Sequence, residues 1–246
     1  VLRALTEVPG GGFLDGAQRE RIRARLAAWL AGQVAATFGP LAALRRAAAD
    51  EPGLRGLAHL LEEGLGIVPR HAALLPRLAP ARLGQLGLRI GRHAVFLPAL
   101  LRPAATALRA RLWAAARDVV PPVLPAAGTV TLRPAEEWPA GWAEALGYLP
   151  LGPVAVRLDV AERLGAELAR LTRAGPRPLP PGLASRLGCR AGELPAVLRA
   201  LGFALRPGED GATMVRARRR APTMPAAPSR PADGPFAALA ALRAKA

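Results

Sequence analysis

The sequence is poor in the residue types on which most catalytic sites depend. It has one cysteine, three histidines and two serines in 246 residues. Neither serine has a nucleophile motif around it, so we expect no serine triad. The histidines fall on separate predicted elements, so we expect no zinc site. These residues are Cys189, His59, His71, His93, Ser185 and Ser229.

Lysine is almost absent, which excludes a nucleotide-hydrolysing loop. A phosphate loop needs a glycine-rich turn followed by lysine and serine or threonine, whereas Lys245, the only lysine, lies next to the last residue. The glycine-rich stretch EVPGGGFLDG has no strand signal before it and is better interpreted as a loop. We therefore expect no ATP hydrolysis, no cofactor and no metal from this chain alone.

Long apolar runs are also missing. Arginine, proline or glycine interrupts each stretch before about 18 apolar residues accumulate, so no transmembrane helix or signal peptide is predicted. A single cysteine excludes an intrachain disulfide and favours a reducing compartment. With 51% hydrophobic and 21% charged residues the chain suits one large or two small globular domains, and we expect it to be cytoplasmic without a membrane partner.

What is abundant is arginine. Lysine and arginine together number 34 against 18 acidic residues, a formal charge of +16. Codon bias in a GC-rich genome explains arginine in place of lysine, but it does not explain the excess of positive charge. Three interpretations stay open: contact with nucleic acid, contact with an anionic protein or membrane surface, and compositional background.

The N-terminal part is predicted to be helical. The chain begins at Val1 without methionine, which suggests a processed product or a fragment of something longer. Asp15 and Gln18 form a capping-box pattern at the start of a predicted helix, and its first two turns are rich in arginine. The helix should end at Phe38–Pro40. Pro40 and Pro52 suit the first turns of two further helices. On the second of these, His59 falls on the polar side, so a surface position is expected.

A segment rich in proline and glycine then separates two predicted domains. Residues 121–152 form the expected connector between a helical domain at 1–120 and a domain at 153–220. The connector should hold one short strand at Thr129–Leu132. Its aromatic residues suggest packing over a neighbouring domain, or alternatively a platform for stacked bases. The remaining residues, 221–246, are a low-complexity tail, expected to be mobile with a short terminal helix.

The order of elements in 153–220 predicts a winged-helix-like domain. A strand and a helix capped by Asp159 precede a helix-turn-helix whose turn includes Cys189, and two extended runs follow around PGEDG. Cys189 should be a small buried hydrophobe. In such folds the second helix and the wing meet nucleic acid, although many winged helices bind protein or only pack. The candidate phosphate contacts are Arg186, Arg190, Arg199, Arg216 and Arg218.

The stretch Leu86 to Trp113 combines apolar and basic positions. Pro98 opens a short segment, and Pro103 suits the first turn of a helix. A helical wheel places apolar residues on one side of this helix and basic and aromatic ones on another, which indicates an element that serves as both core and surface. The candidate nucleic-acid-binding residues here are Arg89, Arg92, His93, Arg102, Arg109 and Trp113.

The stretch LGLRIGRHAVFLPALLRPAATALRARLWA resembles the C-terminal region of a family of bacterial, mostly alphaproteobacterial, superfamily-two ATP-dependent helicases related to the mitochondrial RNA-degradation helicase. FLDGAQRERIRARLAAWLAGQVA, LGCRAGELPAVLRALGF and GPFAALAAL are similar to the same family in the same order. In that family an ATP- and magnesium-dependent motor of two RecA-like domains lies upstream. No motif of that motor is present here, so no catalytic residue can be carried over.

The resemblance implies a mainly α, non-catalytic accessory region that contacts single-stranded RNA or DNA through arginines, with the missing motor domains as its partner. Two alternatives remain. One is a free-standing winged-helix DNA-binding protein, and the other is a structural protein-interaction module in which the arginines are compositional.

Overall fold

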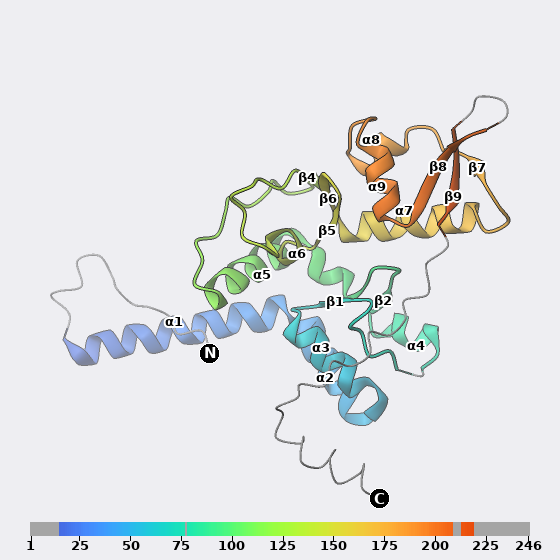
Figure 1. The fold of residues 1–246 in the computed structure, drawn as a ribbon. Helices are drawn as coiled ribbons and strands as arrows, with labels where there is room; N and C mark the ends of the chain where they lie inside the picture. Colours follow the sequence, from blue (N-terminus) through green and yellow to red (C-terminus); the bar gives the residue numbers. More distant parts are fainter. Residues whose placement is uncertain (1–14, 77, 209–212, 219–246) are drawn as a thin grey trace, which may run out of the picture.

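The computed structural model describes residues 15–76, 78–208 and 213–218 (Figure 1). Helices make up about half of these residues, and the strands form three small antiparallel sheets. The fold is therefore mixed α/β with a large helical content. The helical part of the prediction is confirmed, but the sheet content exceeds what the sequence indicated.

The first described element is a long helix that contacts the rest of the protein along only a small part of its length. α1 (Gly16–Thr37) begins at the predicted capping box, in which the Asp15 carboxylate accepts from the Gln18 amide at 2.7 Å. None of its residues is buried, and it extends away from the rest of the molecule (Figure 1). The helix ends before Phe38, where the sequence predicted its end, because Phe38 is buried and Pro40 starts the next helix.

The first hydrophobic core lies beneath a three-stranded sheet of order β1-β3-β2. Its strands are only two or three residues long and pair Val68 and Ile90 with Val95 on either side. The sequence analysis did not predict this sheet. The elements are α2 (Gly39–Asp50), the 3₁₀ helix η2 (Pro52–Leu54), α3 (Arg55–Glu63), β1 (Ile67–Pro69), α4 (Pro80–Gln85), β2 (Arg89–Ile90), β3 (Ala94–Phe96), the 3₁₀ helix η3 (Pro98–Leu101) and α5 (Pro103–Ala116).

Several residues of the N-terminal helices lie where the helical periodicity predicted them. Leu54, Leu57 and Leu61 are fully buried, and His59 lies on the exposed side 3.5 Å from the Glu63 carboxylate, as expected for a surface histidine. The prolines at 98 and 103 open η3 and α5 at the predicted places.

Residues 121–152 contain more structure than one strand. They hold β4 (Thr131–Leu132), α6 (Trp142–Ala145) and β5 (Tyr148–Leu151), and β5 turns into β6 (Val154–Arg157) to give a sheet of order β4-β6-β5. Trp142 and Tyr148 are buried in a cluster with α5. These two rings therefore pack in the interior and are covered against stacking by bases. The domain limits at 120, 152 and 220 stay a prediction.

The C-terminal unit encloses its own core between three helices and a sheet of order β7-β9-β8 (Figure 1). Leu194, Val197 and Leu198 of α9 face inward as predicted. Asp159 does not cap the first helix; it lies in the first turn and accepts from Arg157, because the helix already begins at Leu158. The elements are α7 (Leu158–Leu171), β7 (Arg177–Pro178), α8 (Leu183–Leu187), α9 (Leu194–Ala200), β8 (Phe203–Pro207) and β9 (Thr213–Ala217).

The turn after α8 matches its prediction only in part. The turn after α8 does contain Gly188 in the left-handed region, but Cys189 is half-buried at the edge of the core rather than enclosed by it. Burial raises the pKa of its thiol. The PGEDG turn and the tail from 221 lie outside the described residues.

Within the described ranges, no single helix is long and apolar enough to cross a membrane. α1 and α2 meet the length and composition only together, and they are bent by 71° relative to each other.

Candidate nucleic-acid interface

The turn between β2 and β3 is fixed by a carboxylate from a distant helix. Glu162 of α7 accepts from three consecutive backbone amides: Arg92 at 2.7 Å, His93 at 2.7 Å and Ala94 at 2.9 Å. The carboxyl group also approaches Gly91 so closely that an added methyl group would lie 2.2 Å from its carbon. Glu162 therefore joins the basic turn of the first half to the C-terminal unit.

The Arg92 side chain leaves this turn toward the C-terminal unit. Its Cζ lies 5.4 Å from the centre of the Phe203 ring, a cation–π distance. A methyl group at Gly202 would lie 2.8 Å from Arg92 Nη2, so glycine leaves the space that the guanidinium occupies. The side chain remains exposed, with its charge available to solvent.

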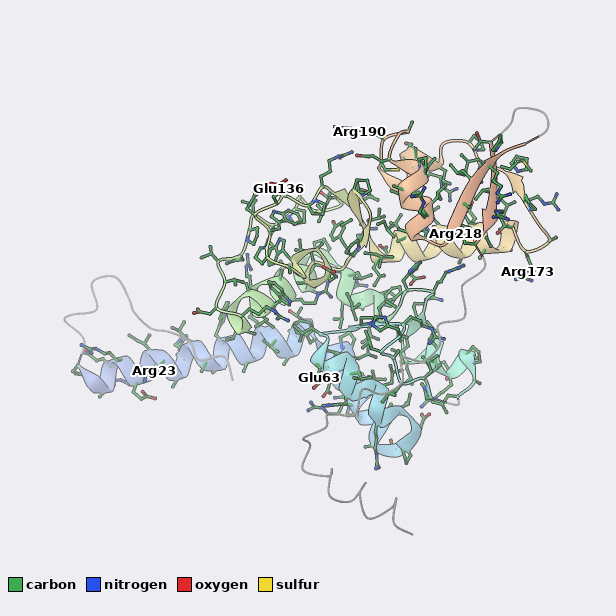
Figure 2. All side chains as sticks on the ribbon, viewed as in Figure 1. Arg23, Glu63, Glu136, Arg173, Arg190 and Arg218 are labelled. Atoms are coloured by element: carbon green, nitrogen blue, oxygen red, sulfur yellow. The ribbon has the colours of Figure 1, made fainter. Side chains whose placement is uncertain are left out.

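Two further arginines reach the same glycine along the backbone. The Gly202 amide donates to the Arg199 carbonyl at 3.1 Å, and the Arg218 amide donates to the Gly202 carbonyl at 2.9 Å. Figure 2 shows Arg218 at the end of β9 nearest the β2 region. The Arg92 side chain and the backbones of Arg199 and Arg218 thus meet at Gly202. We call these three residues, which were predicted from separate parts of the sequence, the Gly202 cluster.

The Gly202 cluster has no acidic counterpart. All three side chains are exposed, and among the residues that the structure describes none of them forms an ion pair with a carboxylate. Some exposed arginines elsewhere are paired, for example Arg45 with Glu62 and Arg186 with Glu167, and others are not. Neighbouring like charges repel unless an anion lies between them, so this surface suits an anionic partner.

The other predicted contact residues lie on several elements. Arg186 is engaged by the Glu167 carboxylate at 3.0 and 2.5 Å, and Arg190 lies at the opposite end of the C-terminal unit from Arg218 (Figure 2). Arg102 is exposed at the start of α5, and Arg89 is exposed on β2. Arg216 is half-buried on β9. His93 is half-buried, and its amide is held by Glu162.

Arg109 is not on the surface that the helical wheel suggested. Only 2% of it is exposed, and it donates to the carbonyls of Leu100 and Ala145 at 3.1 and 2.7 Å. Burial lowers the pKa of its guanidinium to about 10. The wheel went wrong here because α6 covers this side of α5, which periodicity within one helix cannot reveal.

Trp113 is half-buried one turn further along α5. Its ring centre lies 5.8 Å from that of Trp142 at 57°, and Arg117 Cζ lies 4.3 Å from its ring. The indole thus has Trp142 of α6 and Arg117 as neighbours, so Trp113 contributes to packing between α5 and α6.

Sequence reasoning missed Glu162 and Gly202. Glu162 sits on α7 in a run of alternating charge and apolar residues that suggests an ordinary helix face. Its neighbours Ala161 and Leu164 are both buried in the structure, but nothing in the sequence marks Glu162 itself. Gly202 follows a helix, and the sequence therefore indicates a helix end there. Its φ is +89°, and its contact with Arg92 could not be predicted from the sequence.

No group of three or more histidine, cysteine, aspartate or glutamate residues in the described part of the chain could hold a metal ion. No protein-family model, curated protein or solved structure matches this chain.

Proposed function

We propose that this chain is a non-catalytic nucleic-acid-binding region that contacts a single strand through the Gly202 cluster. The observation that carries the proposal is that the Arg92 guanidinium and the backbones of Arg199 and Arg218 meet at Gly202, and that these three exposed arginines have no carboxylate partner among the described residues. Arginine guanidinium groups bind phosphate through parallel hydrogen bonds. Contacts to phosphate position a strand without reading its sequence, so binding is expected to depend on salt and little on base sequence.

The rigidity of the turn supports this proposal. Arg92 is exposed at its guanidinium, yet its backbone amide is held by Glu162, and its side chain rests on Phe203. A charged side chain that is already ordered loses less conformational entropy when it binds. A free surface arginine has no such arrangement.

We further propose that the region belongs to an ATP-dependent helicase, as the resemblance of Leu86 to Ala114 and of the other matching segments implies. The ATP and magnesium sites of such an enzyme would then be in the upstream motor, and the accessory region would contact the strand. Reading the genomic DNA directly upstream for an in-frame phosphate loop tests this part. Finding no such frame would contradict the helicase assignment and leave the binding proposal intact.

A winged-helix fold of residues 153–220 is the second candidate, with duplex DNA as its partner. The order α7, β7, α8, α9, β8, β9 with sheet order β7-β9-β8 favours it. However, the outer side of α9 is partly covered, because Ala196 packs against the β5–β6 turn, where a methyl group at Gly152 would lie 3.6 Å from its Cβ. Insertion of α9 into a major groove would require this turn to move, so we favour single-strand contact.

The test is a salt series with matched charge changes. Binding of a labelled single-stranded RNA, the same DNA sequence and its duplex is measured by anisotropy for the unmodified chain. It is then measured for a triple variant, Arg92→Ala, Arg199→Ala and Arg218→Ala. A control triple variant, Arg25→Ala, Arg46→Ala and Arg111→Ala, removes three exposed, unpaired arginines elsewhere and gives the same net charge.

Loss of three phosphate contacts should lower the slope of log affinity against log salt by about 2, at roughly 0.7 per contact on a single strand. Affinity should fall at least about tenfold, whereas the control triple should change both far less. Equal losses in the two variants would mean that the charge acts as a diffuse background. A site-specific preference for duplex would favour the winged-helix candidate, and salt-insensitive affinity near zero would favour the protein-interaction module.

A further inference from the structure

Arg109 is buried with one end of its guanidinium unsatisfied. Nε and Nη1 donate to the carbonyls of Ala145 and Leu100, but Nη2 has no hydrogen-bond partner among the described residues. The side chain is 98% buried, since 2% is exposed. A buried donor without an acceptor destabilises the folded state, and the cost is larger when the donor is charged.

Arg109 belongs to the lining of a cavity. Arg109 and Gly147 both line a cavity of about 620 Å³ between α5, α6 and the strands β1 and β5. A methyl group at Gly147 would lie 2.6 Å from Nη2, so glycine at this position leaves the space that the buried guanidinium occupies. The volume is within the range of small-molecule sites. Most of the lining is apolar and includes Leu65, Ile67, Leu112, Trp113, Leu149 and Leu158.

The charges around the cavity define what fits beside Arg109. Arg109 is the one charged residue of the lining that is fully buried, while Arg117, Glu63 and Glu144 are exposed where they line the cavity. The exposed charges carry one positive and two negative groups, so they do not attract a ligand with several negative charges. A single negative charge at the buried end would neutralise Arg109, and an apolar remainder would cover the leucine and tryptophan surface.

We propose that this cavity binds a monoanionic organic carboxylate with an apolar body, the carboxylate accepting from Arg109 Nη2. This inference is independent of the nucleic-acid proposal, because the cavity lies on α5 and α6 and shares no residue with the Gly202 cluster. The ligand would supply the acceptor that the fold leaves out. Burial of the charge without a counterion already lowers the pKa of Arg109 to about 10, and a bound carboxylate would raise it again.

The probe pair is octanoate and 1-octanol, which share an apolar chain and differ in the charged head. Calorimetric titration of the intact chain should give octanoate at least about tenfold higher affinity than octanol, the size expected for a charge-assisted hydrogen bond. In Arg109→Met, which keeps the length of the side chain, the preference for octanoate should disappear while octanol binding persists. Equal affinities for the two probes in the unmodified chain, or binding of neither, would overturn the proposal.

A second variant keeps the test decisive even where Arg109→Met does not fold. Ala116 lines the cavity on α5, and Ala115 beside it is exposed and does not. Ala116→Phe should reduce octanoate affinity at least about tenfold by occupying the cavity, and Ala115→Phe should leave it unchanged. Equal octanoate affinity in these two variants would show that the probe binds elsewhere and would refute the proposed site.

Discussion

Glu162 and Arg109 are the two charged side chains buried in the described part of the chain, and the protein treats them in opposite ways. Glu162 receives three backbone amides from the β2–β3 turn. Arg109 finds two carbonyls and leaves Nη2 without an acceptor. The difference shows that burial of a charge alone does not indicate a role. The carboxylate of Glu162 is held by backbone amides and joins two parts of the fold, whereas Arg109 keeps a buried donor without an acceptor, which is the observation behind the ligand proposal.

The largest effect is expected from removing the Glu162 carboxylate. Glu162→Ala deprives three amides of their acceptor, and we expect a loss of about 3 kcal/mol in the free energy of unfolding by denaturant. The matched control is Glu167→Ala on the same helix, whose carboxylate is partly exposed and pairs with Arg186; it should cost less than about 1 kcal/mol. Similar losses in both variants would mean that Glu162 is not what connects the two halves.

A smaller loss of stability is expected from a substitution in the β2–β3 turn, next to the Glu162 carboxyl group. In Gly91→Ala the new methyl group would lie 2.2 Å from the Glu162 carboxyl carbon. The carboxylate or the turn must then shift, at a cost of about 2 kcal/mol. Gly84→Ala, in α4 with open space around it, should be neutral or stabilising by about 0.5 kcal/mol. Thermal or denaturant unfolding of the two variants measures the difference, and a stable Gly91→Ala would show that the turn has room to spare.

The smallest effect concerns Arg109 and depends on pH. Its pKa is lowered to about 10 in the folded chain from an ordinary value of 12.5, so the unfolded chain binds more protons between these values. Stability contributed by this site is therefore lowest below pH 10 and rises as pH increases through it.

Between pH 9 and 11 the unmodified chain should gain about 1 kcal/mol relative to Arg109→Met. Taking the difference between the two chains removes the contribution of other groups, including Tyr148, whose pKa is raised by burial. A constant difference across this range would mean that the guanidinium is better solvated than its burial indicates.

Local elements were predictable because their causes are local. The capping box at Asp15, the leucines 54, 57 and 61, and the prolines that open α2, η3 and α5 all act within a few residues, and the structure confirms them. The sheet of β1, β2 and β3 escaped because strands of two or three residues are too short to show an alternating pattern.

The candidate site was predictable only in part. Arg92, Arg199 and Arg218 could be named from the sequence, but the approach of Arg92 to Gly202 is a contact between residues more than a hundred positions apart. Arg109 was misplaced because an arginine on a helix is ordinarily exposed, and only α6 packing over it makes it internal. Glu162 gave no signal, since its partners are backbone amides, which every residue possesses.

The three hydrogen bonds between Glu162 and the β2–β3 turn also affect the rate of amide hydrogen exchange in that turn. One carboxylate serves Arg92, His93 and Ala94 together, so none of these amides can meet solvent fully until α7 and the turn separate. Their hydrogen exchange is then governed by one opening event rather than three. The turn and the C-terminal unit therefore act as one kinetic unit, and Arg92 keeps its place beside Gly202 for as long as that unit stays closed.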